Sequence, residues 1–394
     1  MNRKGLFYSA LVVIMLAPII ALTFTYSESM KGYGREIGSL VRIKSGFYFL
    51  DSITQDVDRS VDIIGKRCIL ECINHVTKEG VGLDSSEDAI KELFTNKTLN
   101  GEKAEIVNTT IYDWINRSKD IAKKRGFILN INITDLHISM YDSFHVLFSF
   151  NFTIELRDKD NVFSFEKSEI KNVPVSIEGM EDPIYLLRTN GKVTNKVEKF
   201  EGNFTELITK GTGGNEWGTG ESVVTNNPYS VDDREEKILV IDSADDSVVN
   251  QFAGVIAKSN TTTIDVPYLI VPKLNITNNT MTVVDGDNQE VWNIGGLYEA
   301  RENSSYISGD GPSFLDRLEN KLTNSYPGKG LESLVNKKEF EESGLEVSER
   351  SNVDYIYFNT NSLNIYKVKG MGDYFRIDED DLDTYGVNNN LKYV

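Results

Sequence analysis

An uncharged run of 21 residues near the N-terminus constrains this chain more than any other feature. The run extends from Leu6 to Tyr26 and reads LFYSALVVIMLAPIIALTFTY. As an α-helix rising ~1.5 Å per residue, it is long enough to cross the ~30 Å hydrocarbon core of a bilayer. The basic residues Arg3 and Lys4 precede it, so the positive-inside rule places residues 1–5 in the cytoplasm and the remainder outside the cell. The sequence therefore predicts a single-pass anchor in the lipid bilayer, followed by a large extracellular ectodomain.

A cleaved secretory signal is the alternative to an anchor. The apolar region of such a signal usually spans ~7 to 15 residues and ends at small residues of the A-x-A type. The run here is longer, and the segment from Ala17 to Thr23 contains no such site. Pro18 predicts a kink in the helix, which membrane helices tolerate.

The junction Lys4-Gly5-Leu6-Phe7 places basic residues and a glycine before a long apolar helix. This arrangement resembles the class III signal of archaeal type IV pilin-like surface proteins. The resemblance implies cleavage beside Gly5 by a prepilin peptidase, with Lys4, Gly5 and Leu6 as the processing residues, and other pilin-like subunits as partners. Such proteins usually carry an acidic residue five places into the mature chain, where this sequence has Ala10. That departure favours a minor, capping or unassembled pilin-like protein over a major filament subunit.

Three later stretches resemble recurrent segments in a group of uncharacterised archaeal surface proteins that begin with the same kind of helix. These stretches are residues 173–185, Gly311 to Asn320 and Phe375 to Glu379. Together with the N-terminus they cover nearly the whole chain. The resemblance implies a membrane-anchored architecture, and it implies no activity.

Length and composition bound the ectodomain. The segment from Ser27 to Val394 exceeds the usual domain of ~100 to 200 residues, so one elongated unit and two domains both remain open. The formal net charge of −18 argues against nucleic acid as a partner and for a solvated surface. Two cysteines are too few for a disulfide-built scaffold, so stability must come from core packing.

Sequons of the form N-x-[ST] follow the apolar run at about twice the frequency that chance predicts. Because the ectodomain is predicted to be exported, we expect glycosylation of its surface, although an Asn-rich and Thr-rich composition also generates matches. The predicted acceptors are Asn96, Asn108, Asn116, Asn132, Asn151, Asn203, Asn260, Asn275, Asn278 and Asn303.

The apolar residues between Leu50 and Val76 recur at spacings of three and four, which predicts a long amphipathic helix over Ile37 to Val76. Gly32, Gly34 and Gly38 precede it and predict a flexible or bent neck. A membrane helix continued by an amphipathic helix is similar to the two-part first helix of pilin-like proteins. The apolar stripe is wide enough to pack on a core, with coiled-coil pairing as the alternative.

Two further helices and an antiparallel meander are predicted next. The helices cover Ser85 to Phe94 and Ile111 to Lys124, and alternating apolar residues predict strands over Phe127 to Ile133, His145 to Glu155 and Phe163 to Val175. The predicted fold class is therefore α+β. A long N-terminal helix, transmembrane and then amphipathic, packs on an antiparallel β meander, with a second mixed α/β subregion beyond it.

The second subregion combines short strands and helices. Its predicted strands are Lys237 to Asp242, Val266 to Val271, Met281 to Val284, Val353 to Phe358 and Leu363 to Val368, and its helices are Val248 to Ala257 and Phe314 to Leu322. The predicted organisation is a basic tail at 1–5, a transmembrane helix at 6–26, a helix-and-meander region at 27–209, a Gly-rich loop at 210–230 and a mixed region at 231–394.

Cys68, Cys72 and His75 lie within one arc of the predicted long helix, which is how a helix presents metal ligands. No second Cys pair or nearby His completes a zinc site, and the three positions also continue the apolar stripe, so no metal site is predicted. Buried apolar contacts, an intermolecular disulfide and a thiol role remain open. A bridge within the intact helix is disfavoured, because Cβ atoms four residues apart stand ~6 Å from each other. His137 and His145 lie eight residues apart in a predicted hairpin, where a cross-strand pair and ordinary half-buried strand residues both remain open. Without a paired acid, the two define no site.

The remaining motifs do not define an enzyme. The acidic clusters Asp285 to Glu290 and Asp378 to Asp383 are candidate calcium sites, with solvated turns as the alternative. The Gly-rich segment Lys210 to Gly220 lacks the ending of a phosphate loop, and HExxH is absent. An exported hydrolase that uses acidic residues alone is the weakest hypothesis, because no paired carboxylates stand in a recognisable context. The sequence predicts neither catalysis nor a cofactor.

The sequence thus favours a non-enzymatic cell-surface protein, a pilin-like subunit or a membrane-anchored ectodomain for surface assembly or adhesion. The alternative is a single-pass anchored ligand-binding ectodomain unrelated to filaments. That ectodomain would bind through the Gly-rich loop and its aromatic neighbours Trp217 and Tyr229.

Overall fold

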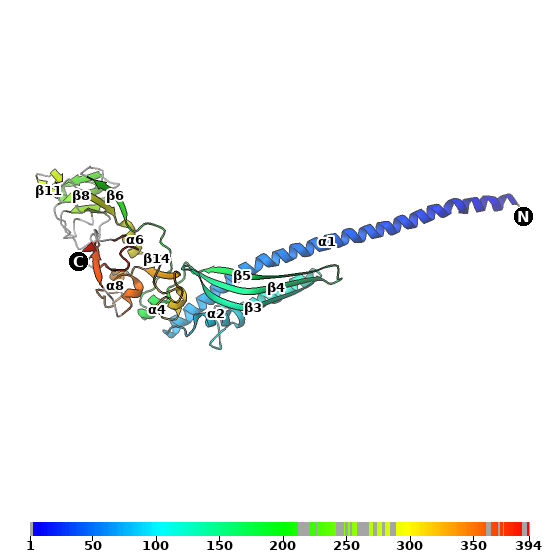
Figure 1. The fold of residues 1–394 in the computed structure, drawn as a ribbon, viewed down its shortest axis with the longest axis horizontal. Helices are drawn as coiled ribbons and strands as arrows, with labels where there is room; N and C mark the ends of the chain where they lie inside the picture. Colours follow the sequence, from blue (N-terminus) through cyan, green and yellow to red (C-terminus); the bar gives the residue numbers. More distant parts are fainter. Residues whose placement is uncertain are drawn as a thin grey trace.

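The computed structural model is an α+β fold, as the sequence predicts (Figure 1). The side chains of residues 3–14, 28–29, 31–36, 206–222 and 253–293 lie outside the described part of the chain. The residues that the structure describes are 3–211, 221–224, 227–241, 248, 251–252, 254–257, 268–270, 274–277, 280–283, 289–359, 364–368, 371–372, 374–387 and 392–393.

The described α-helices are α1 (Arg3–Glu79), α2 (Ser86–Asn96), α3 (Ile111–Lys124), α4 (Pro183–Arg188), α6 (Gly295–Glu302), α7 (Phe314–Leu318), α8 (Lys337–Glu342) and α9 (Asp354–Tyr357). The described strands are β1 (Thr98–Leu99), β2 (Glu102–Lys103), β3 (Phe127–Asp142), β4 (His145–Asp158), β5 (Ser164–Ser176), β6 (Glu206–Gly211), β7 (Glu221–Val224), β8 (Lys237–Ile241), β9 (Gly254–Ala257), β10 (Tyr268–Ile270), β11 (Leu274–Thr277), β12 (Thr280–Val283), β13 (Gln289–Asn293), β14 (Tyr306–Gly309), β15 (Gly330–Ser333), β16 (Ile365–Val368), β17 (Arg376–Asp378) and β18 (Lys392–Tyr393).

Helix α1 projects from the rest of the molecule, with the N-terminus at its free end (Figure 1). Its backbone stays helical through Gly32, Gly34 and Gly38, so the flexible or bent neck predicted there is wrong. Each glycine costs at most ~1 kcal/mol relative to alanine, which the adjoining turns of a long helix can offset. Pro18 also lies within α1. Within the part of the chain that the structure describes, no helix combines the length and apolarity that crossing a membrane requires.

The C-terminal half of α1 lies along the antiparallel sheet β3-β4-β5 (Figure 1). Alternate residues of β4 point to each face, so Val146, Phe148, Phe150 and Phe152 are buried beneath the helices. Helix α1 packs on β4 and β5, while α2 and α3 pack on β3. The opposite face of the sheet is exposed, and it carries polar residues such as Asn132 of β3.

The apolar stripe of α1 enters the core of this sheet. Val57, Val61 and Ile64 are buried at spacings of three and four, which places them on one side of the helix. A glycine at position 65 lets α1 approach the sheet closely. A Cβ atom at Gly65 would lie 2.9 Å from the ring of Phe148, which is tighter than packing allows.

The distal region, from α4 to the C-terminus, is built from short elements. The hairpins β14-β15 and β11-β12, the sheet β17-β16-β18 and the sheet β10-β13-β6 are antiparallel, whereas β7-β8-β9 is parallel. A second apolar cluster lies here and includes Ile294, Leu297, Phe375 and Ile377.

Two predicted elements of this region are wrong. The predicted strand at Val353 to Phe358 contains helix α9, because the Tyr357 N–H bonds to the Val353 carbonyl and the short turn buries Asp354 and Tyr357. Residues 254–257, predicted as the end of a helix, form strand β9 and pair in parallel with β8. Tertiary contacts therefore override local propensity at both places.

Candidate functional site

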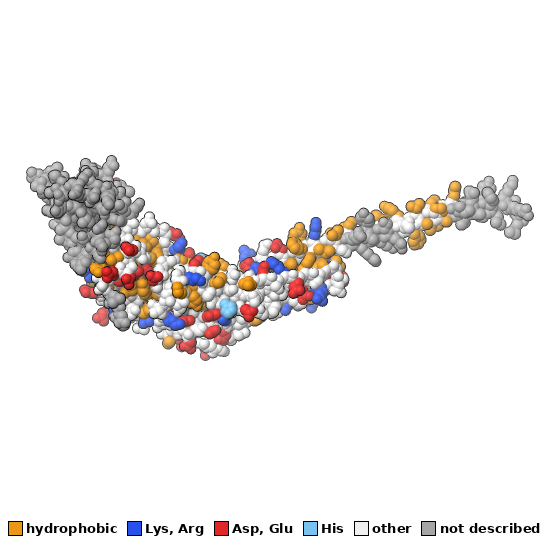
Figure 2. Space-filling view, viewed as in Figure 1, with side chains coloured by type: hydrophobic (Ala, Val, Ile, Leu, Met, Phe, Trp, Pro, Cys, Tyr) orange, Lys and Arg blue, Asp and Glu red, His pale blue; other side chains and the backbone are white. Residues whose placement is uncertain are grey.

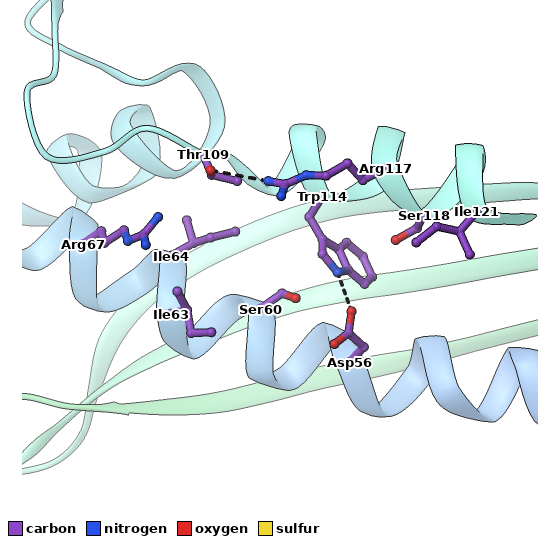
Figure 3. Close-up of a pocket in the computed structure, with 10 residues that line it drawn as sticks. All are labelled: Asp56, Ser60, Ile63, Ile64, Arg67, Thr109, Trp114, Arg117, Ser118 and Ile121. Carbon is purple, nitrogen blue, oxygen red and sulfur yellow. Dashed lines mark hydrogen bonds between the residues drawn. The ribbon is translucent and has the colours of Figure 1, made fainter.

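A pocket lies between α1 and α3, with a volume of about 370 Å³ (Figure 3). Ile63 and Ile64 of α1 face Ile121 and Trp114 of α3 across it. The Trp114 indole crosses the gap, and its Nε1–H donates a hydrogen bond of 2.8 Å to Asp56 Oδ2 (Figure 3). The complete lining is Asp56, Ser60, Ile63, Ile64, Arg67, Thr109, Trp114, Arg117, Ser118 and Ile121.

The start of α3 is held in place by a capping box. The Asp113 N–H donates to Thr110 Oγ1, and Asp113 Oδ2 accepts from the Thr110 N–H at 2.9 Å. Lys97 lies 2.6 Å from the same carboxylate, and its hydrogen bond is the main cause that lowers the pKa of Asp113 to about 2. These contacts fix the first turn of α3 and thereby the position of Trp114.

The loop that leads into α3 is fastened to α1 by Glu71. This buried carboxylate accepts hydrogen bonds from the Glu105 N–H at 3.1 Å and the Ile106 N–H at 2.6 Å. Thr109 follows in the same loop and reaches the pocket. This rim of the pocket is therefore preorganised by side-chain to backbone bonds from α1.

Two arginines stand at this rim, one on each helix. Arg67 Nη1 donates to Asn108 Oδ1 at 2.6 Å, and Arg117 Nη2 makes a long contact of 3.4 Å with Thr109 Oγ1. Among the described residues, no carboxylate lies within ion-pair distance of either arginine, whereas Arg42 pairs with Asp158 at 2.6 Å. The pocket is thus apolar in its middle and positively charged at one end.

A second cluster of charged residues lies in the distal region and is fully buried. Arg317 Nη1 donates to Asp182 Oδ2 at 2.6 Å and to Asp354 Oδ2 at 2.8 Å. The Tyr306 hydroxyl donates to Asp182, and the Ser333 hydroxyl donates to Asp354, both at 2.7 Å. Burial raises the pKa of Asp354, while the neighbouring guanidinium acts in the opposite direction. A site with no access to solvent cannot receive a ligand, so this cluster organises the fold.

Two of the segments that the sequence analysis singled out, residues 173–185 and 311–320, meet at this cluster. Asp182 belongs to the first stretch and Arg317 to the second. Nearby, Asn352 connects the third segment, residues 375–379, to the chain before α9. Its Oδ1 accepts from the Arg376 N–H at 2.7 Å, and its amide donates to the Val335 carbonyl at 2.7 Å. Segments far apart in the sequence thereby support one buried network.

Two acids near this network have raised pKa values. Burial, with the nearby Asp354 charge, raises the pKa of Glu332 to about 7, and burial raises the pKa of Asp381 to about 9. Glu332 accepts hydrogen bonds from the Tyr385 hydroxyl and the Asp310 N–H, whereas Asp381 Oδ2 is buried without a hydrogen-bond partner. In the described parts of the chain, no group of His, Cys, Asp or Glu has the arrangement of a metal site.

The predicted cysteine and histidine positions do not form a site in the described structure. Cys68 and Cys72 are free thiols within the core, and burial raises the pKa of each. His137 lies opposite Ser149, and His145 lies opposite Asp142, so the two histidines are not cross-strand neighbours. The turn between β3 and β4 falls at residues 143–144, so His145 begins β4 opposite the end of β3, whereas His137 lies several residues further from the turn.

The sequon asparagines lie at the surface wherever the structure describes their side chains. All those whose side chains the structure describes are exposed, whereas other asparagines, such as Asn195 and Asn352, are partly or fully buried. Asn260 and Asn278, together with the side chain of Asn275, lie outside the described residues. The exposed acceptors are Asn96, Asn108, Asn116, Asn132, Asn151, Asn203 and Asn303.

Other predicted sites fall partly outside the described residues. The side chains of the processing residues Lys4, Gly5 and Leu6 do so, as do residues 212–220 of the Gly-rich loop and 284–288 of the first acidic cluster. The second acidic cluster divides, because Asp378 and Asp381 are buried and Glu379 is exposed.

Sequence reasoning missed both the pair Arg67 and Arg117 and the buried Arg317. Trp114 stood on the apolar face of a predicted helix, but no pattern linked Arg67 to Arg117 across the intervening loop. Arg317 and Asp182 lie in segments that the sequence analysis singled out, residues 311–320 and 173–185, but no pattern joined the two. Comparison of the chain with protein-family models, curated proteins and solved structures finds no match.

Proposed function

We propose that the protein is a non-enzymatic, pilin-like cell-surface protein, anchored by the apolar run from Leu6 to Tyr26 and carrying its α+β ectodomain outside the cell. The observation that carries this proposal is the apolar surface of the projecting part of α1 (Figure 2). Ile19 and Leu22 are more than half exposed, as are Phe24 and Tyr26. Apolar surface this dense requires an apolar cover, which lipid supplies.

The exposed apolar surface continues beyond the length that a bilayer covers. Ile37, Leu40 and Val41 are 57%, 61% and 63% exposed, and spacings of three and four place them on one face of α1. A bilayer core of ~30 Å covers ~20 helical residues, so it cannot cover both Leu6 and Val41. This excess supports a lateral partner of similar chemistry, a helix of another pilin-like subunit.

The N-terminal junction and the sequons support the same compartment. The Lys4-Gly5-Leu6 junction resembles a prepilin-type processing site, and basic residues before the run favour a cytoplasmic N-terminus. Exposed sequon asparagines are available for glycosylation of an extracellular ectodomain.

Intact-mass measurement and N-terminal sequencing of the native protein test the anchor and its processing. After glycan removal, we expect a chain that begins at Gly5 or Leu6 in the membrane fraction. A chain that begins at Met1 or Asn2 would reduce the proposal to a permanent tether. Recovery of the unanchored chain from the culture medium would contradict the anchor itself.

Cysteine crosslinking tests the lateral helix partner. Under mild oxidation of native membranes, Leu40→Cys is expected to give disulfide-linked chains, because its face of α1 is exposed and apolar. Ser39→Cys is the control, since position 39 is half-buried and lies about 100° from Leu40 and about 160° from Val41 around the helix. The buried thiols of Cys68 and Cys72 should contribute little background. Equal crosslinking at both positions, or none, contradicts a specific helix partner.

A second candidate function is an anchored ectodomain that binds a ligand. The pocket between α1 and α3 favours it, because helices of the membrane-proximal unit enclose the pocket and charged side chains mark one end. The Gly-rich loop is a separate hypothesis for the same function. Deletion of Lys210 to Gly220 should abolish attachment to the partner while leaving the fold intact, and unchanged attachment excludes that loop.

A further inference from the structure

Arg67 and Arg117 form the positive end of the α1/α3 pocket, and most of their N–H groups make no hydrogen bond to the described residues. A guanidinium carries five N–H donors in a planar fork, and within the described residues Arg67 gives one hydrogen bond and Arg117 one long contact. Their acceptors, Asn108 and Thr109, are adjacent residues joined by a hydrogen bond of 3.1 Å. The two guanidinium groups therefore converge on one place from opposite helices.

Two arginines stand at this rim without a carboxylate partner among the described residues. The whole chain has a formal net charge of −18, so carboxylates are plentiful. Some arginines of the described structure pair with them, as Arg157 does with Glu155 at 2.7 Å, whereas Arg188 and Arg350 donate to backbone carbonyls. Two like charges held together without a carboxylate favour an anion, because planar guanidinium groups bind carboxylate and phosphate through paired hydrogen bonds.

The middle of the pocket is apolar and only partly covered. Ile63 is 46% exposed and Ile121 is 45% exposed, and they lie on facing helices beside Trp114. Burial of this surface by a ligand is favourable at roughly 25 cal/mol per Å². The volume of about 370 Å³ falls within the range of small-molecule pockets.

The two ends of the pocket differ in charge, which sets the direction of a ligand. Asp56 lies at the end away from the arginines and is occupied by the Trp114 Nε1–H. Its carboxylate repels an anion from that end. A ligand therefore places its negative group at Arg67 and Arg117 and its apolar part over Ile63 and Ile121.

We infer that this pocket binds a small organic anion, with a carboxylate or phosphate group between Arg67 and Arg117 and an apolar body against Trp114. The inference names the ligand class of the second candidate function. It does not depend on the filament partner, because α1 and α3 form the pocket within one chain.

Calorimetric titration of the full chain in nanodiscs tests the inference, with 4-phenylbutyrate as the probe and empty nanodiscs as the blank. The amide 4-phenylbutanamide matches the probe in size and apolar body but lacks the charge. We expect the acid to bind at least tenfold more tightly than the amide, and the difference to shrink as salt rises. Equal affinities, or no binding of the acid, overturn the inference.

Matched substitutions locate the site. The pair Arg67→Gln and Arg117→Gln should remove the preference for the acid, because both guanidinium groups are lost. Arg59→Gln removes one positive charge from an exposed position of α1 outside the pocket lining and should leave the preference unchanged. An unchanged melting temperature shows that the double variant folds. A preference that survives the double substitution, or that Arg59→Gln removes equally, contradicts this site.

Discussion

Two regions of this molecule both bury apolar side chains, but they differ in the charged groups buried beside them. In the helix-and-sheet region, which extends from α1 to β5, α1 buries Val57, Val61 and Ile64 against the sheet β3-β4-β5. In the distal region, α4, α7 and α9 meet around Arg317, which is fully buried between two aspartates. One region relies on apolar surface, and the other contains a network of buried charges.

The difference has a physical consequence. Apolar burial is non-directional and tolerates small changes of shape, so its cost grows gradually with the atoms removed. A buried charge network requires every partner, because a charge left alone in the interior costs several kcal/mol. We therefore expect single substitutions to change the free energy of unfolding more in the distal region, from α4 onward, than in the helix-and-sheet region.

The largest expected effect is the loss of the buried arginine. Arg317→Met leaves Asp182 and Asp354 buried without a cation, so the free energy of unfolding should fall by about 3 to 5 kcal/mol. Urea unfolding followed by circular dichroism measures this change. Arg188→Gln is the control, since Arg188 is exposed and donates only to the Asn320 carbonyl.

The triple variant Arg317→Met, Asp182→Asn, Asp354→Asn sharpens this test. Removal of all three charges should recover part of the lost stability, because no unpaired ion remains. A triple variant that is less stable than Arg317→Met would show that the buried charges are not the reason for the loss.

The next expected effect is a pH dependence in the distal region. The pKa of Glu332 is raised from 4.5 to about 7, so the folded protein holds a proton that the unfolded chain releases. This contribution to stability is complete below about pH 4.5 and is lost as the pH rises through about 7. Relative to wild type, Glu332→Gln should gain about 1 to 3 kcal/mol between pH 5 and pH 8.

Urea unfolding of both proteins at the two pH values measures this gain. Two other groups contribute to the pH dependence of stability. The raised pKa of Asp381 lowers the stability at high pH, whereas burial lowers the pKa of Lys337 to about 7, which raises the stability at high pH. Both groups are present in each protein. Glu379→Gln is the control, because that neighbouring carboxylate is exposed. A pH dependence that Glu332→Gln leaves unchanged would assign it to another group.

A conservative change in the apolar core should cost less. Ile154 of β4 is fully buried, and Ile154→Val removes one methylene, so we expect a loss of about 1 kcal/mol. Thermal or urea unfolding measures it. A loss as large as that of Arg317→Met would remove the contrast between the two regions.

The smallest expected effect is that of an exposed ion pair. Lys66 lies 3.1 Å from Asp62 on the surface of α1, where water and salt screen the attraction. Lys66→Gln should change the free energy of unfolding by less than about 0.5 kcal/mol. A larger loss would show that ion pairs also stabilise the helix-and-sheet region.

Much of the helix-and-sheet region could be predicted from the sequence. The stripe from Val57 to Val76 and the alternation in β4 report directly which side chains face the core, because helix and strand periods are local properties. The predicted helices Ser85 to Phe94 and Ile111 to Lys124 likewise begin within one residue of the starts of α2 and α3. The predicted neck failed because three glycines do not interrupt a helix of this length.

The distal region was harder to predict, since its elements are short and its contacts are long-range. The helix α9 replaces a predicted strand, and its Asp354 is buried only because Arg317 and Ser333 are supplied from other elements. The α1/α3 pocket was missed for the same reason. Its arginines belong to different helices that only the fold brings together.

The sequence by itself determined the α+β class, the apolar run from Leu6 to Tyr26 and the pattern of the long helix and the meander. These properties depend on the order of residues over a few turns or strands, where the chain's local geometry acts directly. Only the tertiary structure decided the buried network around Arg317 and the placement of Arg67 and Arg117 at one pocket. Coulomb interactions and desolvation depend on distance and burial in space, and spacing along the chain specifies neither.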